Sequence, residues 1–169
     1  TVLVGNPPYS NFGMMNKILW ILSLLEDYKR GLNEKKINLD DDFIKFLRLS
    51  QYLINATGYG ILGIITNNTY FDGITHSQMR KFIAESMSKI QIRDLQGSST
   101  KKEKCLDGSK DENVFDIQQG VGISIWTRFK VLPAKVEHSD LWGLRKNKYD
   151  QLKNNKNVCF SELIPTEPY

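Results

Sequence analysis

The chain opens with a short apolar run that stops at two prolines, and this pattern constrains the fold more than any other in the sequence. Val2–Gly5 contains no polar residue, and Asn6-Pro7-Pro8-Tyr9 follows it directly. A continuous apolar run bounded by turn residues is typical of a strand buried in a parallel sheet. Pro7 drives Asn6 toward an extended backbone, and both prolines fix their own φ angle. We therefore expect a rigid turn at the carboxyl end of a buried strand.

Helical and strand patterns alternate along the rest of the chain. Helices are predicted over Met14–Lys29 with a stop at Gly31, over the segment from Asp40-Asp41-Asp42 to Gly58, and over Ser77–Ser88. In the second helix the apolar residues Phe43, Phe46, Leu47, Leu53 and Ile54 recur at helical spacing. Strands are predicted over Gly60–Thr66, Ile90–Leu95 and Gly120–Phe129, with a loop at Asn67–Tyr70. This order indicates an α/β domain with a mostly parallel sheet, in which the last two strands, having no helix between them, pair antiparallel.

Two stretches of the chain lack this pattern. Gln96–Asn113 is polar and rich in Lys, Asp, Ser and Gly, and a loop of this length in a compact domain is either functional or disordered. Beyond Pro133 the pattern weakens, with a short helix expected around Tyr149–Leu152. Leu163–Tyr169 is expected to lead into a further segment.

Composition excludes several classes of protein. The 23 Lys and Arg residues exceed the 19 Asp and Glu residues by a net charge of +4, which suits phosphate binding without demonstrating it. Cys105 and Cys159 are not spaced as metal ligands, and His76 and His138 have no sequence partners that indicate a triad or a metal, so no metal site is expected. The apolar stretch Ile18–Leu25 is too short to span a membrane, and no signal peptide is visible. We expect a reduced, cytoplasmic protein and, because the chain starts inside a strand without Met, a fragment of a longer one.

The turn after the first strand presents an amide oxygen, a free carbonyl and an aromatic ring. In open α/β sheets, ligands bind at the carboxyl ends of the strands. The exocyclic nitrogen of adenine is a poor nucleophile because its lone pair is delocalised into the ring. Acceptance of its two hydrogens by the Asn6 side chain and the Pro7 carbonyl would localise that lone pair, with Tyr9 stacked on the base. The alternative is a turn with no chemical role, since Asn and Pro are common turn formers.

Over about residues 1–130 the sequence resembles the gamma-type adenine-specific (amino) DNA methyltransferases, whose motif IV is Asn-Pro-Pro-Tyr. Asp42–Leu53 resembles the helix that follows this motif, Gly58–Phe71 the next strand and its loop, and Val114–Phe129 the element called motif VIII. The segment Gly97–Trp126 is most similar to large bacterial restriction–modification polypeptides that carry nuclease, helicase and methylase parts in one chain.

The resemblance implies the C-terminal half of a Rossmann-like methyltransferase domain that uses S-adenosylmethionine. Residues 1–130 would belong to the catalytic domain, and residues 131–169 would lead toward a DNA target-recognition region. The family's main cofactor-binding elements precede its Asn-Pro-Pro-Tyr strand and have no counterpart in this sequence. Cofactor binding within this chain is therefore undetermined, and we expect the fragment alone to be inactive.

The resemblance also implies roles for individual residues. Asn6 and Pro7 would accept the amino hydrogens, while Tyr9 and Phe115 would stack on the two faces of an adenine flipped out of double-stranded DNA. Asn68 and Tyr70 are candidates for a loop facing the site, and a plain turn is the alternative for both. Lys101, Lys102 and Lys104 are candidates for phosphate contacts. Because acidic neighbours offset their charge, a solvated mobile loop is the alternative for the lysines.

Three other functions stay open at this point. Methylases of protein glutamine, which act on translation release factors, share Asn-Pro-Pro-Tyr because a glutamine amide presents the same poor nucleophile. Ribosomal RNA methylases are a second enzymatic alternative. A nucleic-acid-binding module that has kept the fold and lost the chemistry is the third, and the intact Asn6–Tyr9 motif argues against it.

Overall fold

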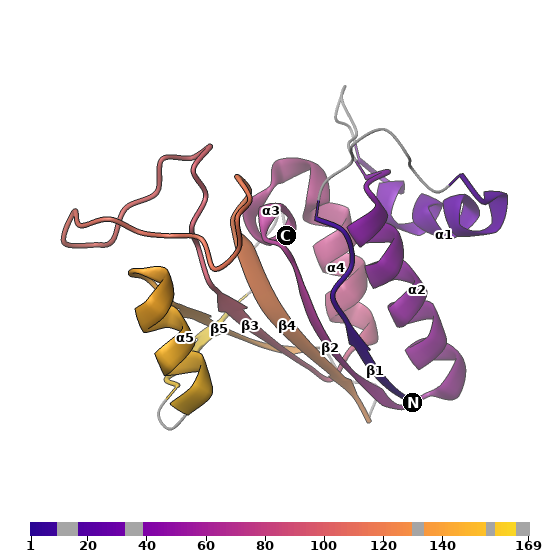
Figure 1. Cartoon of the computed structure of the whole chain (residues 1–169). Helices are drawn as coiled ribbons and strands as arrows, with labels where there is room; N and C mark the ends of the chain where they lie inside the picture. Colours follow the sequence, from indigo (N-terminus) through magenta and orange to yellow (C-terminus); the bar gives the residue numbers. More distant parts are fainter. Residues whose placement is uncertain (10–16, 33–38, 130–133, 155–157, 165–169) are drawn as a thin grey trace.

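A computed structural model describes residues 1–9, 17–32, 39–129, 134–154 and 158–164, and in this part of the chain six strands form one mixed sheet (Figure 1). The strands are β1 (Val2–Gly5), β2 (Gly60–Asn67), β3 (Lys89–Asp94), β4 (Val121–Arg128), β5 (Lys135–Asp140) and β6 (Ser161–Leu163). Their order is β1-β2-β4-β3-β5-β6. β1 is parallel to β2 and β3 is parallel to β5, while β4 lies between β2 and β3 and is antiparallel to both. β6 pairs antiparallel with β5. The predicted fold class is confirmed: β1, β2, β3 and β5 run in one direction, and β4 and β6 run antiparallel to them.

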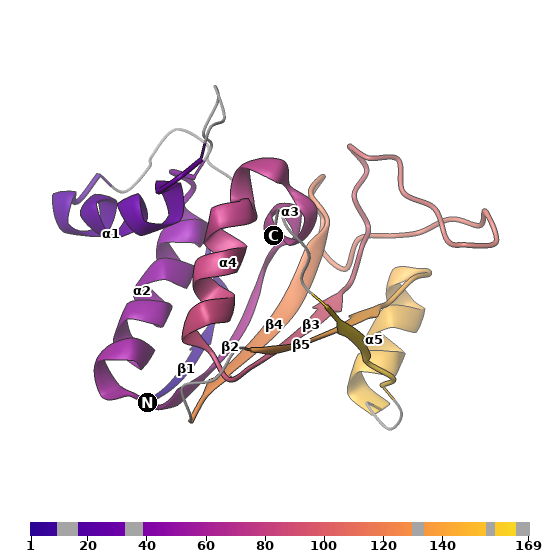
Figure 2. The ribbon, with the colours of Figure 1, turned by 180° about the vertical axis from the view of Figure 1, so that it is seen from behind.

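Three helices cover one face of the sheet, as the two opposite views in Figures 1 and 2 show. They are α1 (Leu19–Lys29), α2 (Asp42–Thr57) and α4 (Ser77–Ser86). The main core lies between them and the sheet, and its fully or almost fully buried members include Leu25, Tyr28, Phe43, Ile44, Leu47, Leu62, Met79, Ile83 and Trp126. A short helix, α3 (Thr69–Asp72), and a 3₁₀ turn, η1 (Ile74–His76), connect β2 to α4.

A smaller apolar cluster lies on the other face of the sheet, where α5 (Arg145–Asn154) and the long loop between β3 and β4 pack (Figure 1). Its buried members are Leu95, Val114, Val121 and Leu141, and Tyr9 and Phe115 pack against them. The Asn6–Tyr9 turn and this loop therefore meet over one apolar cluster. No helix in the described part of the chain is long and apolar enough to cross a membrane.

The expected helices and strands are present, with shifted ends. Residues 14–16 of the predicted first helix lie outside the described residues, and α1 begins at Leu19. Gly31 and Gly58, predicted as helix stops, adopt positive φ angles of 80° and 76°, which glycine tolerates best. The predicted loop at Asn67–Tyr70 is wrong in part, because the backbone coils into α3 from Thr69.

Burial is where the apolar patterns mislead. In the second helix Phe43, Leu47 and Ile54 are buried, but Phe46 is 46% exposed and Leu53 38%. The first strand was expected to be buried, yet Val2 and Val4 are 76% and 87% exposed. Among the described residues β1 pairs with β2 alone, and its Leu3 faces the main core while Val2 and Val4 face the uncovered side of the sheet.

The segment after Pro133 is more regular than predicted. β5 joins the sheet beside β3, and the expected short helix at Tyr149–Leu152 is part of the longer α5. The sequence pattern does not indicate β5, because polar cross-strand contacts hold this strand in the sheet. Glu137 accepts a hydrogen bond from Gln91 at 2.8 Å and forms an ion pair with Lys89 at 3.0 Å. Leu163 ends β6, and residues 165–169 of the expected leader lie outside the described residues.

Candidate active site

The Asn6–Tyr9 turn lies at the carboxyl end of β1, as predicted. Pro7 is buried, Asn6 is exposed, and Tyr9 is half-buried. Asn67, the last residue of β2, donates from Nδ2 to the Tyr9 carbonyl at 3.3 Å, and its Oδ1 accepts from the Thr69 backbone N–H at 2.8 Å. The ends of two adjacent parallel strands thus hold the turn in place.

Tyr9 and Phe115 stack on each other although they are far apart in the sequence. Their ring centroids lie 5.4 Å apart with an interplanar angle of 26°, a favourable offset arrangement. The Tyr9 hydroxyl donates to Asn6 Oδ1. Burial raises the pKa of the Tyr9 hydroxyl and outweighs the hydrogen bond to Asn6, which lowers it, so this hydroxyl stays protonated and remains a donor at neutral pH. Asn6, Pro7, Tyr9 and Phe115 form one cluster at the end of the sheet.

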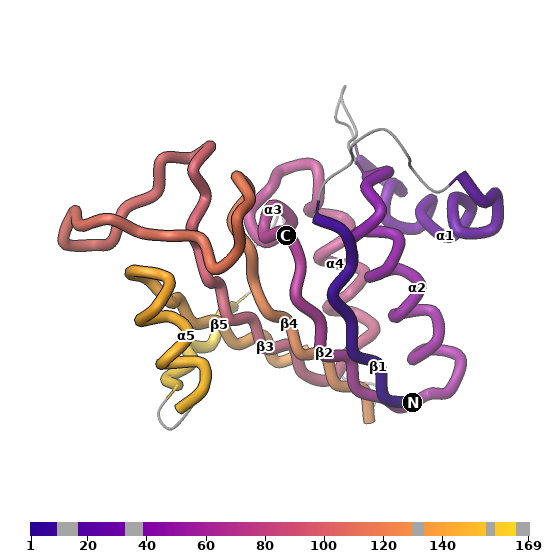
Figure 3. Tube along the Cα trace, viewed as in Figure 1, coloured from indigo at the N-terminus to yellow at the C-terminus, as the bar shows by residue number. Residues whose placement is uncertain are grey.

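Phe115 belongs to a long loop that is anchored at its base (Figure 3). The Asn113 side chain donates to the carbonyls of Gly97 at 3.1 Å and Gln119 at 2.6 Å, and its Oδ1 accepts from the Phe115 N–H at 2.9 Å. Gly97 has a φ of +84°, and a Cβ there would lie 2.4 Å from Asn113 Cα. Only glycine allows the two arms of the loop to approach this closely.

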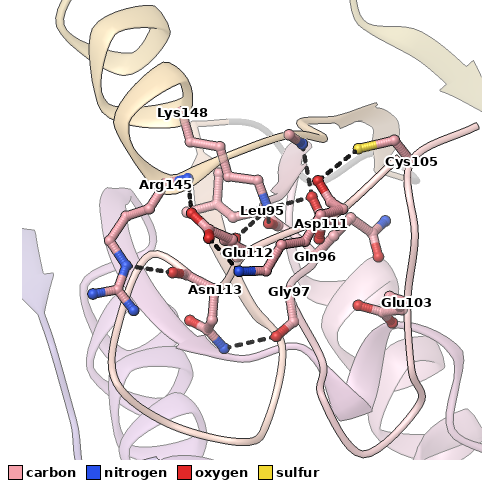
Figure 4. A network of polar contacts seen from close by, with 12 residues as sticks. Leu95, Gln96, Gly97, Glu103, Cys105, Asp111, Glu112, Asn113, Arg145 and Lys148 are labelled. Atoms are coloured by element: carbon pink, nitrogen blue, oxygen red, sulfur yellow. Dashed lines mark hydrogen bonds and ion pairs between the residues drawn. The ribbon is translucent and has the colours of Figure 1, made fainter. Parts of the chain in front are cut away.

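A fully buried ion pair joins the loop to α5. Lys148 Nζ lies 2.8 Å from Asp111 Oδ1, and both side chains have 0% exposure. Lys148 also donates to the Leu95 and Glu112 carbonyls at 2.7 Å each, and Asp111 accepts from the Gly143 N–H at 2.7 Å (Figure 4). This pair was not predicted from the sequence, because nothing local distinguishes these two residues within a charge-rich stretch.

The three candidate phosphate-binding lysines are exposed on the outer part of the loop. Lys101 forms an ion pair with Asp72 at 3.0 Å, and Lys102 adopts a φ of +53°. The backbone of Lys104 pairs with that of Lys110 in an isolated antiparallel β-bridge. The loop next to them is closed by a reciprocal contact, in which the Ser98 N–H donates to Glu103 Oε2 at 2.7 Å and the Glu103 N–H donates to the Ser98 carbonyl at 3.2 Å.

Asn68 and Tyr70 do not face an open site, in contrast to the expectation for them. Asn68 is buried and donates to Asp94 Oδ1 at 3.0 Å. Tyr70 lies in the main core, where its hydroxyl is 2.7 Å from Ser124 Oγ and burial raises its pKa to about 12. The turn of helix that starts at Thr69 carries the Tyr70 ring inward, and the sequence pattern of a loop did not predict this.

His138 has neighbours that the sequence did not indicate, because β5 was not predicted. Its ring and the carboxylates of Asp94 and Asp140 offer atoms within 4.8 Å of one another. Both carboxylates already accept hydrogen bonds: Asp94 from Asn68 and from the Gln96 N–H at 2.9 Å, and Asp140 from Gln96 Nε2 at 2.7 Å. We therefore interpret Asp94, His138 and Asp140 as part of a structural hydrogen-bond network at the carboxyl end of β3.

Two cavities lie near this site, one bordered by Phe115 and the other by Pro8. The larger, of about 700 Å³, opens between the arms of the long loop, and its lining includes Ser98, Lys102, Glu103, Phe115 and Arg145. The smaller, of about 380 Å³, is apolar and lies beside Pro8, where it is lined by Trp20, Ile21, Phe46 and Leu49. Phe115 and Pro8 therefore each border open space.

Residues 1–100 match the Eco57I restriction-modification methylase family, and the chain belongs to this family. No curated protein is similar enough to the chain to count as a match.

Three solved structures superpose on almost the whole chain. The ATP-dependent Type ISP restriction-modification enzyme LlaBIII bound to DNA is 27% identical, with a TM-score of 0.84 over 99% of this chain. The DrdV–DNA complex is 21% identical with a TM-score of 0.85, and a nuclease-deletion mutant of the Type ISP enzyme LlaGI with a DNA substrate mimic is 20% identical with a TM-score of 0.84, each again over 99% of this chain. The chain spans 12%, 18% and 17% of those three chains.

Proposed function

We propose that this chain is part of the catalytic domain of an adenine-specific DNA methyltransferase in a restriction–modification system. It would transfer a methyl group from S-adenosylmethionine to the exocyclic amine of a flipped adenine. The observation that carries the proposal is the cluster at the end of β1, where the Asn6 amide oxygen is bound by Tyr9 and the Tyr9 ring stacks on Phe115 from a distant part of the chain.

The cluster matches the needs of an amino nucleophile. In the proposed reaction Asn6 Oδ1 and the Pro7 carbonyl accept hydrogen bonds from the two amino hydrogens, which directs the nitrogen lone pair toward the methyl donor. The N–C bond forms as the S–C bond of the donor breaks, and the methylated nitrogen then releases one proton to solvent. Tyr9 and Phe115 hold the two faces of the base. Positioning and electrostatics provide the catalysis, and no covalent intermediate on the protein is needed.

In this structure the cluster leaves no space for a base between its two aromatic rings. The rings of Tyr9 and Phe115 contact each other, and the Tyr9 hydroxyl occupies the Asn6 oxygen. A flipped adenine therefore enters only when the rings separate and Tyr9 releases Asn6. Extrusion of the base from the duplex adds its own cost, which is lowest for bases that are already unpaired.

S-adenosylmethionine would supply a methyl group bound to a positively charged sulfur. The electron pair of the carbon–sulfur bond would stay on the sulfur when the methyl group is transferred. The described residues do not fit this cofactor. Gly58 precedes β2 and Gly60 is its first residue, at the end of the parallel β1–β2 pair opposite Asn6, so they form no glycine loop beside the site. We assign cofactor binding to parts of the parent polypeptide outside these residues, and we expect the 169-residue chain alone to be inactive.

DNA is the proposed partner, together with the remaining parts of the parent polypeptide. All three solved relatives were determined with DNA or a DNA substrate mimic. Lys101, Lys102 and Lys104 are exposed on the loop that carries Phe115, which places them suitably for phosphate contacts that weaken with salt. Residues 1–130 would form the catalytic part, and residues 131–169 would continue the sheet through β5 and lead toward target recognition.

The proposal is tested with the complete parent polypeptide, S-adenosylmethionine and genomic DNA that lacks adenine methylation. We expect N6-methyladenine in the digested nucleosides, measured by mass spectrometry, and no methylated cytosine. Transfer to a release-factor glutamine or to ribosomal RNA, with DNA left unmodified, would replace the proposed substrate. Cofactor binding without transfer to any of these would indicate a binding module.

Replacing Tyr9 separates its two contacts. Tyr9→Phe keeps the stacking ring and releases Asn6 Oδ1, so we expect methyl transfer to stay within about tenfold of the unchanged protein, because one hydrogen bond contributes about 0.5–1.5 kcal/mol. Tyr9→Ala removes the ring as well, and base stacking of about 1–3 kcal/mol predicts a loss of about 5- to 150-fold. Single-turnover methyl transfer measures both, with Tyr59→Phe, an exposed tyrosine, as the control. Equal losses for Tyr9→Phe and Tyr9→Ala would show that the hydroxyl itself is required.

A further inference from the structure

One face of α5 binds the backbone of the segment that carries Phe115. Arg145, Lys148 and Tyr149 are three and four residues apart, so they share one side of the helix. Their side chains donate to four consecutive carbonyls: Lys148 to Glu112 at 2.7 Å, Arg145 to Asn113 at 2.7 Å, Tyr149 to Val114 at 2.5 Å, and Arg145 to Phe115 at 3.0 Å. Figure 4 shows Arg145 and Lys148 reaching from the helix to this segment.

The contacts continue on both sides of these carbonyls. The Arg145 N–H donates to Glu112 Oε2 at 3.0 Å, and its guanidinium pairs with Asp116 at 2.7 Å. Hydrogen bonds from charged donors are stronger than neutral ones, and the planar guanidinium fixes direction as well as distance. The backbone before and after Phe115 is therefore tied to a single rigid element.

Phe115 has both of its backbone polar groups bound. Its N–H donates to Asn113 Oδ1 and its carbonyl accepts from Arg145. With the peptide held on each side, the direction in which the ring leaves the backbone is determined by α5 and Asn113, and that direction brings the ring onto Tyr9.

We propose that α5 is the positioning element of the site, with Arg145 as its central residue and Tyr149 as a supporting one. This inference rests on the proposed function, because it assigns the helix the task of holding Phe115 where it stacks on the target base. Arg145 acts through Phe115 and touches neither substrate nor cofactor. The same segment leads on toward the proposed target-recognition region, so the helix connects that region to the stacking residue.

The test compares Arg145→Ala, Tyr149→Phe and the control Lys146→Ala in the complete parent polypeptide. Lys146 is an exposed cation of the same helix outside this contact face. We expect single-turnover methyl transfer to fall about 100-fold in Arg145→Ala, as small misplacements of a reacting group do, and several-fold in Tyr149→Phe. The KM for S-adenosylmethionine and the activity of Lys146→Ala stay unchanged. Tyr149→Phe removes a single hydroxyl and serves if Arg145→Ala folds poorly.

Two readouts separate positioning from general structural support. With 2-aminopurine at the target position, Arg145→Ala should show brighter fluorescence than the unchanged protein, because the base is extruded but no longer quenched by stacking on Phe115. In a Phe115→Ala background, Arg145→Ala should cause almost no further loss, since coupled residues are not additive.

The possible outcomes distinguish failure of the proposed function from failure of the positioning role of α5. If the unchanged parent leaves adenine unmethylated, the proposed function fails and the inference fails with it. If the parent methylates adenine and Arg145→Ala behaves like Lys146→Ala, the inference alone is overturned. It is also overturned if Arg145→Ala causes its full loss in the Phe115→Ala background, because the arginine would then act independently of the ring.

Discussion

Asn6→Ala is expected to lower methyl transfer by the parent polypeptide by about 10²–10³-fold, the loss typical for removal of one preorganised electrostatic group from a reaction centre. In the proposed mechanism the Asn6 oxygen accepts a hydrogen bond from one of the two amino hydrogens. Without this hydrogen bond the lone pair of the nitrogen is delocalised into the ring again. Because Asn6 is exposed and its side chain bonds to Tyr9, the free energy of unfolding should change by less than about 0.5 kcal/mol.

Steady-state methyl transfer to adenine-containing DNA measures this effect, alongside urea unfolding of the same variant. The expected loss lies in kcat, with the KM for the cofactor nearly unchanged. Asn147→Ala, which removes an exposed asparagine on α5, is the matched control. Retention of more than a tenth of the activity by Asn6→Ala would exclude Asn6 from the chemistry and would leave the Pro7 carbonyl as the acceptor to examine.

The turn that carries Asn6 was predictable because its cause is local. An apolar run followed by Asn-Pro-Pro combines a strand with residues that restrict their own backbone angles, and neither depends on distant parts of the chain. The same holds for the ends of α1 and α2, where Gly31 and Gly58 adopt the positive φ angles that a glycine stop predicts.

Burial and pairing were harder to predict because they depend on distant segments. Val2 and Val4 lie in an apolar run, yet exposure of their side chains depends on which elements cover that face of the sheet. β5 was not predicted because Val136 is its one apolar residue, and Glu137 obtains its partners from β3. No periodicity in a single segment contains that information.

The stacking partner of Tyr9 was expected through the family resemblance, but its support was not. Phe115 is held by Asn113 from the loop and by Arg145 from α5. These contacts join side chains to the backbone N–H and carbonyl groups, so residues 112–115 carry no sequence signature of being bound. The long polar loop accordingly looked unanchored in the sequence, while its anchor, the Lys148–Asp111 pair, is among the most buried features of the fold.

Lys148→Met is expected to destabilise the protein by about 3–5 kcal/mol, because it leaves the Asp111 carboxylate buried without its cation. Both side chains have 0% exposure, and Asp111 Oδ2 has no partner among the described residues. Urea unfolding followed by circular dichroism measures the change. Lys110→Met is the matched control: Lys110 pairs with Glu112 at a similar distance but is 74% exposed, and such surface pairs contribute about 0–1 kcal/mol.

The double variant Asp111→Leu with Lys148→Met shows what the pair contributes. Buried ion pairs replaced entirely by apolar side chains often unfold no more easily than before, so removal of both charges should recover much of the loss caused by Lys148→Met. Recovery should stay incomplete, because Lys148 also satisfies the Leu95 and Glu112 carbonyls, and an orphaned buried carbonyl costs about 1–3 kcal/mol. A double variant as stable as the unchanged protein would mean that water or neighbouring groups satisfy those carbonyls. One no more stable than Lys148→Met would mean that the backbone contacts of the two side chains, including the Gly143 N–H that donates to Asp111, offset whatever is recovered by removal of the Asp111 charge.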